Sequence, residues 1–184
     1  NSPYISQGFN STRFVDIDAD GDKDLFISVL YSSQNSNNFT LYKNNGSSTT
    51  ADFQRITDNY LNNVDVGGSS IITFSDIDND GDKDFFTGQS LGTIAYYENI
   101  GTAQNFSLKF ITEEWQNLLI ISPAFNNRHG ANSLEFSDID GDNDFDLFWG
   151  DLFSKGIYFI QNNGTPANPN VAIVDSIYPH NSPY

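Results

Sequence analysis

Three short stretches of this chain carry aspartate at every second position, which makes them the residues best suited to chemistry. They run from Asp16 to Asp24, from Asp76 to Asp84 and from Asp138 to Asp146. Each holds five aspartates in nine residues, and close carboxylate pairs repel by roughly 3–4 kcal/mol at an effective dielectric constant of about 20. A hard divalent cation with about six to eight oxygen ligands removes this repulsion, and Ca²⁺ is the usual one in proteins. The sequence therefore predicts about three Ca²⁺ sites, one per stretch.

The alternating aspartates have distinct predicted roles in each stretch. We expect the side chains at the first, third, fifth and ninth positions to bind the ion, and the seventh position to contribute its backbone oxygen. The predicted metal-binding residues are Asp16, Asp18, Asp20, Asp22 and Asp24 in the first stretch, Asp76, Asp78, Asp80, Asp82 and Asp84 in the second, and Asp138, Asp140, Asp142, Asp144 and Asp146 in the third.

The sixth position of each stretch must let the chain turn sharply. Gly21 and Gly81 occupy it in the first two stretches, and Asn143 occupies it in the third. Asparagine is among the residues that best tolerate a positive φ, so the turn is expected to survive there. Because Phe145 also replaces the lysine of the other two stretches, the third site is predicted to be the weakest.

The elements that must position these loops are short strands. The Asp-rich stretches lie 60 and 62 residues apart, which predicts three structural units at about residues 1–60, 61–121 and 122–180. Each unit contains four short runs rich in β-branched and aromatic residues and bounded by Gly, Asn and Ser. The predicted strands are 11–15, 25–31, 39–42, 53–57, 71–75, 85–87, 93–97, 106–111, 133–137, 147–149, 156–160 and 171–174. This predicts an all-β fold of four-stranded antiparallel β-propeller blades, with one helical turn allowed at 58–63.

Composition and charge exclude several classes of protein. The net charge is −16, but fifteen of the 24 acidic residues lie in the three stretches, so the acidity belongs to ion sites. No basic patch is available to meet phosphate, which argues against nucleic acid as a partner. The chain has no cysteine and no apolar run long enough to span a membrane. EF-hands need an acidic residue at loop position 12, where this chain has Ile27, Thr87 and Trp149.

Two coupled motifs resemble a known family. The pattern Phe-x-Asp-Ile-Asp-x-Asp-Gly-Asp-x-Asp-hydrophobic-Phe is followed about 20 residues later by Tyr-Tyr-Glu-Asn-x-Gly-Thr. Together they resemble the FG-GAP/VCBS repeat of integrin-like propellers. The resemblance implies Ca²⁺ held between the first two strands of each blade, and extracellular adhesion or ligand binding as the function. Such propellers are typically seven-bladed, and three blades cannot close a ring.

No arrangement of residues indicates catalysis, so we expect a non-enzymatic module. The two histidines, His129 and His180, match no pattern of nucleophile and base. Trp115 and Trp149 are expected in the core between blades. They are alternatively suited to stacking on sugars, which would make the chain a Ca²⁺-dependent lectin. Asn44, Asn99 and Asn162 each precede x-Gly at the end of a predicted strand and are expected to be turn residues with αL geometry at the asparagine and glycine.

The two ends of the sequence suggest how the units continue. Residues 1–4 and 181–184 both read Asn-Ser-Pro-Tyr, so 181–184 is interpreted as the start of a further repeat. The expected partners are copies of the same unit, arranged as a tandem array or docked head to tail, and an extracellular protein or glycan. Both a closed propeller and an open filament satisfy this expectation.

Overall fold

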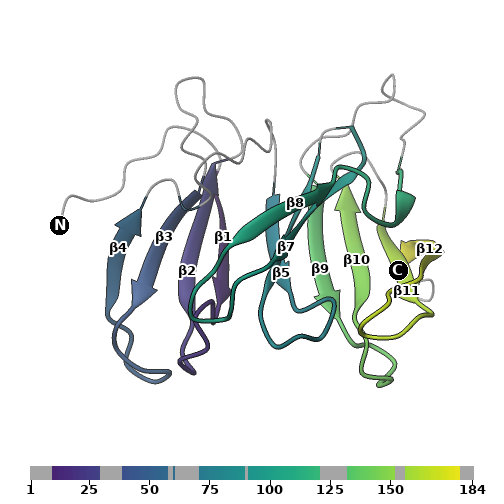
Figure 1. Ribbon diagram of the computed structural model, residues 1–184. Helices are drawn as coiled ribbons and strands as arrows, with labels where there is room; N and C mark the ends of the chain where they lie inside the picture. Colours follow the sequence, from purple (N-terminus) through teal and green to yellow (C-terminus); the bar gives the residue numbers. More distant parts are fainter. Residues whose placement is uncertain are drawn as a thin grey trace.

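The computed structural model describes residues 10–29, 39–57, 60, 71–89, 91–120, 132–151 and 156–178. These residues form twelve strands and one 3₁₀ turn (Figure 1). The strands are β1 (Asn10–Val15), β2 (Asp24–Val29), β3 (Phe39–Asn44), β4 (Phe53–Thr57), β5 (Ile71–Ser75), β6 (Asp84–Gly88), β7 (Ile94–Asn99), β8 (Leu108–Thr112), β9 (Asn132–Ser137), β10 (Asp146–Asp151), β11 (Ile157–Asn162) and β12 (Val171–Tyr178), and the 3₁₀ turn is η1 (Trp115–Asn117). No helix among the described residues is long and apolar enough to cross a membrane.

Every strand predicted from the sequence is present, with ends that differ by a few residues. The strand predicted at 53–57 and the one predicted at 71–75 match β4 and β5 to the residue. The largest shift at a strand start is at β8, which was predicted from residue 106 and begins at Leu108. Residues 30 and 31 of the second predicted strand lie outside the described residues, as does the possible helical turn at 58–63 except for residue 60.

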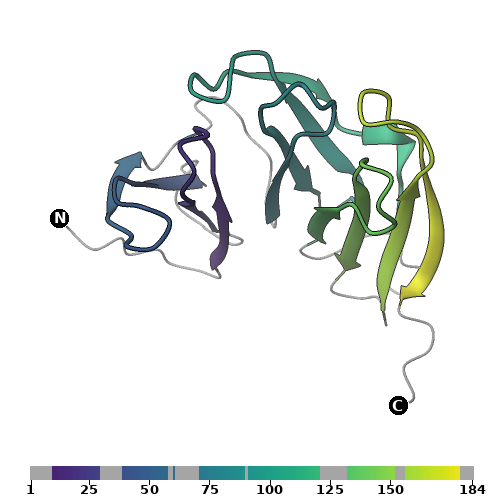
Figure 2. The same cartoon turned by 90° about the horizontal axis from the view of Figure 1, so that it is seen from below.

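The strands form three antiparallel sheets of four, each with its strands in chain order. Sheet 1 contains β1 to β4, sheet 2 contains β5 to β8, and sheet 3 contains β9 to β12. This meander is the expected construction of a propeller blade, and the all-β fold class is confirmed. The first strands β1, β5 and β9 lie next to one another on the inner side of an open arc of blades (Figure 2).

Two apolar cores join the sheets to one another. Successive side chains of a strand point to opposite faces, so β6 directs Phe85 towards sheet 1 and Phe86 towards sheet 3. Phe26 on β2 packs in the first core, and Trp149 on β10 packs in the second. Sheet 2 is therefore covered on both faces, whereas sheets 1 and 3 each bury one face against it.

Both tryptophans belong to the second core. Trp115 is 4% exposed and Trp149 is not exposed at all, so the core interpretation of these residues is confirmed. Trp115 comes from η1, which the sequence did not predict, and its ring meets Phe86 edge to face with centroids 5.3 Å apart. Neither indole is available to stack on a sugar.

Candidate metal centres

The three Asp-rich loops join the first two strands of each sheet. They connect β1 to β2, β5 to β6 and β9 to β10, and all three lie at the same end of the sheets, the lower end in Figure 1. The register of these strand pairs extends to the loop itself, because Val15 pairs with Asp24 and Ser75 pairs with Asp84. Each loop is therefore held at both ends by a hydrogen-bonded ladder, which fixes where its carboxylates can lie.

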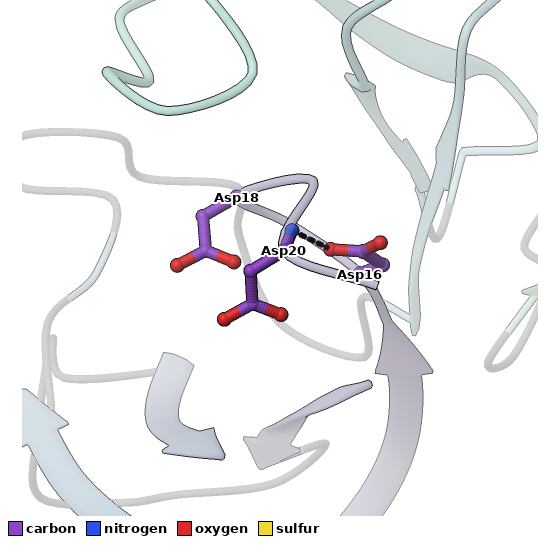
Figure 3. A group of neighbouring side chains, drawn as sticks. All are labelled: Asp16, Asp18 and Asp20. Atoms are coloured by element: carbon purple, nitrogen blue, oxygen red, sulfur yellow. Dashed lines mark hydrogen bonds between the residues drawn. The ribbon is translucent and has the colours of Figure 1, made fainter. Parts of the chain in front are cut away.

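In each loop the first, third and fifth aspartates come together. One carboxylate oxygen from each residue lies within 4.8 Å of the other two in all three groups. Figure 3 shows Asp16, Asp18 and Asp20 around a common space in the first loop. The equivalent groups are Asp76, Asp78 and Asp80 in the second loop, and Asp138, Asp140 and Asp142 in the third.

Backbone amides shape each loop around its aspartates. Asp16 accepts bonds of 3.1 Å from the N–H groups of Asp20 and Gly21. The carboxylate of Asp20 accepts a bond of 3.1 Å from the N–H of Asp22. The other two loops repeat the contacts from the sixth position to the first and from the seventh to the fifth, at 3.0–3.2 Å. The carboxylates thus stabilise the turns of the loop by accepting backbone hydrogen bonds, while one oxygen of each of the first, third and fifth residues lies near the other two.

The sixth position has a positive φ in all three loops. The angle is +93° at Gly21, +97° at Gly81 and +71° at Asn143, so the expectation that asparagine preserves this turn is confirmed. A second position also requires positive φ and was missed from the sequence. It is occupied by Ala19, Asn79 and Gly141, with φ of +56°, +60° and +82°. Only the third loop places glycine there, which offsets its asparagine at the sixth position.

The ninth aspartate lies beneath each loop and bonds it to the third strand of the sheet. Asp84 is 2% exposed, and its carboxylate accepts bonds from the N–H of Asn99 at 2.8 Å and from the N–H of Ile77 at 3.4 Å. Asp24 and Asp146 repeat the contact to the strand at 2.8 Å. The predicted role of this position as a metal ligand stays a prediction, and the structure adds an anchoring role that the spacing alone did not indicate.

The asparagine that follows on the third strand organises the next turn. The side-chain oxygen of Asn99 accepts bonds from the N–H groups of Gly101 at 3.1 Å and Ser107 at 2.9 Å. Asn44 and Asn162 make the equivalent pairs of bonds. The interpretation of these residues as turn residues is confirmed.

The expected αL conformation at these turns is wrong. No positive φ occurs at the three asparagines or at the glycines two residues after them. Glycine is needed for space: a Cβ on Gly101 would lie 2.1 Å from the carbonyl oxygen of Asn105, and the other two turns are equally tight. The close approach of two backbone segments therefore replaces dihedral freedom as the reason for glycine.

Burial and mutual repulsion oppose ionisation of several of these carboxyls. Burial, with the charges of Asp78 and Asp80 adding to it, raises the pKa of Asp84 from 3.8 to about 7. Burial and the neighbouring Asp142 raise the pKa of Asp144 to about 6. The pKa of Asp82 is raised for the same two reasons, burial first. A divalent cation would reverse this cost by favouring the ionised forms.

Several carboxylate oxygens in the loops are buried without a protein partner. Within the described residues, one oxygen each of Asp18, Asp76, Asp22, Asp82 and Asp144 is inaccessible to solvent and accepts no hydrogen bond. Buried oxygens without donors are costly unless a cation satisfies them. The donor set contains only oxygen, which suits a hard ion such as Ca²⁺. The residues present therefore fit the predicted ion.

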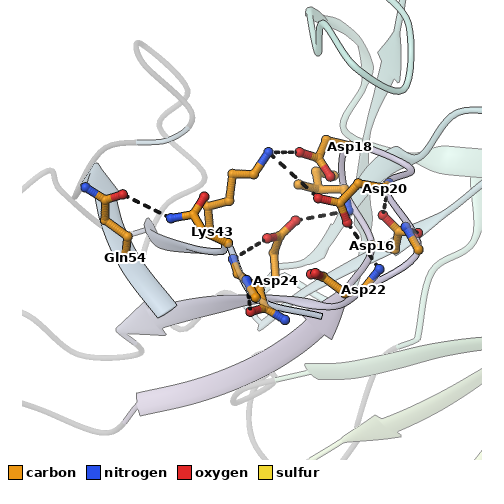
Figure 4. A network of polar contacts seen from close by, with 12 residues as sticks. Asp16, Asp18, Asp20, Asp22, Asp24, Lys43 and Gln54 are labelled. Atoms are coloured by element: carbon orange, nitrogen blue, oxygen red, sulfur yellow. Dashed lines mark hydrogen bonds and ion pairs between the residues drawn. The ribbon is translucent and has the colours of Figure 1, made fainter. Parts of the chain in front are cut away.

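The residue before each turn asparagine faces the loop and differs among the three sheets. Lys43 forms an ion pair with Asp18 and lies 3.9 Å from a carboxylate oxygen of Asp20 (Figure 4). Gln161, its equivalent in sheet 3, donates a bond of 2.9 Å to Asp140. In sheet 2 the equivalent residue is Glu98, whose charge adds to the repulsion at Asp78. This position was not predicted from the sequence, because it lies some twenty residues from the loop in the chain.

The remaining candidate residues from the sequence fall outside the described part of the chain. His129 and His180 are outside the described residues, so the structure places neither. Residues 181–184, interpreted as the start of another repeat, are also outside them. The EF-hand alternative is excluded, because strands and not helices flank all three loops.

Comparison with known families agrees with this geometry. A family model described as an FG-GAP-like repeat matches residues 16–87 and again residues 76–149, which together span more than half of the chain. No curated protein and no solved structure matches it. Both matched segments begin at the first aspartate of a loop and continue beyond the start of the next loop. The chain therefore belongs to the FG-GAP-like repeat family.

Proposed function

We propose that this protein is a Ca²⁺-binding structural and adhesive module that binds one ion in each Asp-rich loop. The observation that carries the proposal is the threefold repetition of a carboxylate triplet, in which one buried oxygen of Asp18 in the first loop and of Asp76 in the second accepts no hydrogen bond. In this proposal the carboxylate of the ninth aspartate binds the ion together with the triplet, and the backbone oxygen of the seventh residue completes the ligand set. The ions hold the loops together against their own charge.

We further propose that the module works outside the cell. FG-GAP repeats are typical of extracellular proteins, and loops of this kind are filled where Ca²⁺ is abundant. Three bound ions would change the net charge from −16 to −10, which lowers the repulsion between neighbouring modules. We propose an adhesive or assembling role at this location, with copies of the same blade unit as the first expected partner.

A Ca²⁺-dependent lectin is the second candidate function. It is favoured by a cleft of about 480 Å³ between sheets 1 and 2, which combines the charged side chains of Asp18 and Lys43 with the aromatic rings of Tyr60 and Phe106. Mixed aromatic and polar linings suit sugars, which present both apolar faces and hydroxyls. The cleft, and not the buried tryptophans, is the surface that a sugar would reach.

Calorimetric titration of the metal-free chain with Ca²⁺ tests the proposed function. We expect about three ions per chain and a higher melting temperature with Ca²⁺ than with a chelator. Asp78→Asn should remove one site, whereas Asp52→Asn, which removes an exposed charge outside the loops, should remove none. Absence of binding heat together with an unchanged melting temperature would contradict the proposal. A glycan array probed with and without Ca²⁺ tests the lectin alternative.

A further inference from the structure

The contact between neighbouring sheets repeats with the same geometry. Phe26 on β2 packs against Phe74 on β5 of the next sheet, with ring centroids 4.7 Å apart and planes at 46°. Phe86 on β6 packs against Phe136 on β9 with the same 4.7 Å separation and planes at 49°. In each case the second-strand phenylalanine of one sheet meets the first-strand phenylalanine of the sheet that follows. The sequence encodes this pairing, because the two phenylalanines flank each loop two residues outside it.

A third aromatic ring covers each second-strand phenylalanine. It comes from the chain after the fourth strand in sheets 1 and 2: Tyr60 meets Phe26 edge to face at 5.0 Å, and Trp115 meets Phe86 in the same way at 5.3 Å. In sheet 3, Tyr178 at the end of β12 lies 5.5 Å from Phe148. Sheet 3 thus carries the same receiving arrangement as the other two sheets, although no fourth sheet follows it among the described residues.

Among the described residues, the equivalent positions at the two ends of the row have no partner from a neighbouring sheet. Phe14 corresponds to Phe74 and Phe136, yet its side chain is 56% exposed. Ile139 in the third loop corresponds to Ile17 and Ile77, which are 6% and 3% exposed against the following sheet, and Ile139 is 53% exposed. Phe14 and Ile139 are therefore exposed at the positions where their equivalents in the other sheets are covered by a neighbouring sheet.

We propose that the open face of sheet 3 binds the open face of sheet 1 of a second copy of this chain. Phe148 then packs on Phe14 of the second copy, under Tyr178, and Ile139 is buried as its equivalents are. This occupant is favoured because the contact continues an interface that the chain already makes twice, with the same residue types in the same places. The inference deepens the assembly part of the proposed function.

The geometry of this contact determines whether the copies form a ring or a filament. The two faces are different surfaces, so the contact is head to tail and each added copy leaves one face of each kind open. Such a contact grows into a ring if the rotation between copies closes, and into an open filament if it does not. The net charge of −16 opposes the contact between copies, so Ca²⁺ and physiological ionic strength should favour it.

The average mass of the full chain in solution, measured by light scattering in Ca²⁺ at increasing concentration, tests the proposal. We expect the mass to rise above the 20.5 kDa of one chain. A mass that stays at 20.5 kDa at every concentration would overturn the inference, even if Ca²⁺ binds. Because Ca²⁺ binding is titrated separately on the same sample, failure of assembly and failure of the proposed function are distinguishable.

Two variants that each block one face make the test specific. Phe14→Lys and Phe148→Lys should each be unable to form long assemblies, but an equimolar mixture should form a dimer that grows no further, because each partner supplies the face that the other lacks. Leu91→Lys is the matched control, since Leu91 is 61% exposed away from both faces and its variant should assemble as the parent does.

The folding of each variant is checked by circular dichroism. Phe148 packs on Phe159 with ring centroids 5.1 Å apart, so Phe148→Lys is replaced by Ile139→Lys if it does not fold. A parent chain that assembles while the mixture of variants stays monomeric would show that other surfaces make the contact, and the proposed pairing would be wrong.

Discussion

The buried carboxyl of Asp84 leads to a prediction whose sign depends on whether Ca²⁺ is bound. This side chain is 2% exposed, and burial raises its pKa from 3.8 to about 7. In metal-free protein the folded state therefore retains a proton that the unfolded chain releases. The stability of the metal-free protein should fall as the pH rises from about 4 through about 7, because the unfolded state binds fewer protons over that range.

The substitution Asp84→Asn removes this charge while keeping the shape of the side chain. At about 1.4 kcal/mol per pKa unit, ionising Asp84 in the folded chain costs on the order of 4 kcal/mol above its pKa, and relaxation of the loop reduces that figure. Asparagine still accepts the 2.8 Å bond from the N–H of Asn99, but it places an amide group near the N–H of Ile77, which costs about 1–2 kcal/mol. The net expectation for the metal-free variant is a gain of about 1–2 kcal/mol at about pH 8.

In Ca²⁺ the same substitution should destabilise the protein. A site filled at about one hundred times its Kd contributes about 2.7 kcal/mol to folding, and a loop that has lost one carboxylate should lose much of this. The predicted order of stability is therefore variant above parent in chelator and parent above variant in Ca²⁺. At about pH 5 in chelator, where Asp84 is protonated in the folded parent, the difference between the two proteins should nearly vanish.

Thermal unfolding followed by circular dichroism measures this crossover. For a chain of this size, about 1 kcal/mol corresponds to about 2–4 °C in Tm. Asp52→Asn is the control, because it removes an exposed charge from the turn after β3 and should shift the Tm little under any condition. A variant less stable than the parent in chelator at about pH 8, or a metal-free parent that gains stability as the pH rises, would refute the reasoning.

Three further predictions concern single contacts. Lys43→Gln should tighten Ca²⁺ binding at the first site by up to about fivefold in calorimetric titration, because the ammonium that pairs with Asp18 no longer competes, and unchanged affinity would contradict this. Ala19→Gly should raise stability in chemical denaturation by about 0.5–1 kcal/mol, since it relieves a φ of +56°; a loss would show that the loop is not strained there. Gly101→Ala should lower stability by about 1–3 kcal/mol because its Cβ would meet a backbone oxygen at 2.1 Å, whereas Gly150→Ala, with its nearest contact at 3.8 Å, should be nearly neutral.

The local features of the fold could be predicted from the sequence because they depend on neighbouring residues. Alternating aspartates and the flanking β-branched and aromatic runs placed the loops and all twelve strands, and tolerance of positive φ explained Asn143. Features that depend on distant segments could not be found in this way. The ion pair of Lys43 with Asp18 joins the third strand to the loop between the first two strands, and the one-turn 3₁₀ helix at Trp115 is too short to show a period.

The αL geometry predicted at the Asn-x-Gly turns is wrong because the glycine there is required by a distant segment of the chain. A glycine after asparagine is most often explained by its backbone dihedrals, which is a local property. At Gly101 the cause is the carbonyl oxygen of Asn105 on the returning chain, and only the folded turn brings that atom close. The buried position of Asp84 was hidden for a similar reason, since its partner on the third strand is fifteen residues away.

The bonds through Asn99 connect the second loop with the joint between sheets 1 and 2. Asp84 accepts from the N–H of Asn99, and the side chain of Asn99 accepts from the N–H of Ser107. The neighbouring ring of Phe106 lies 5.6 Å from that of Tyr60 beside sheet 1. Tension applied along a row of blades would load this joint, so a Ca²⁺ ion bound in the second loop would also raise the bending stiffness of the joint. Calcium would then act on the mechanics of the whole row, making it rigid where the ion is plentiful and compliant where it is scarce.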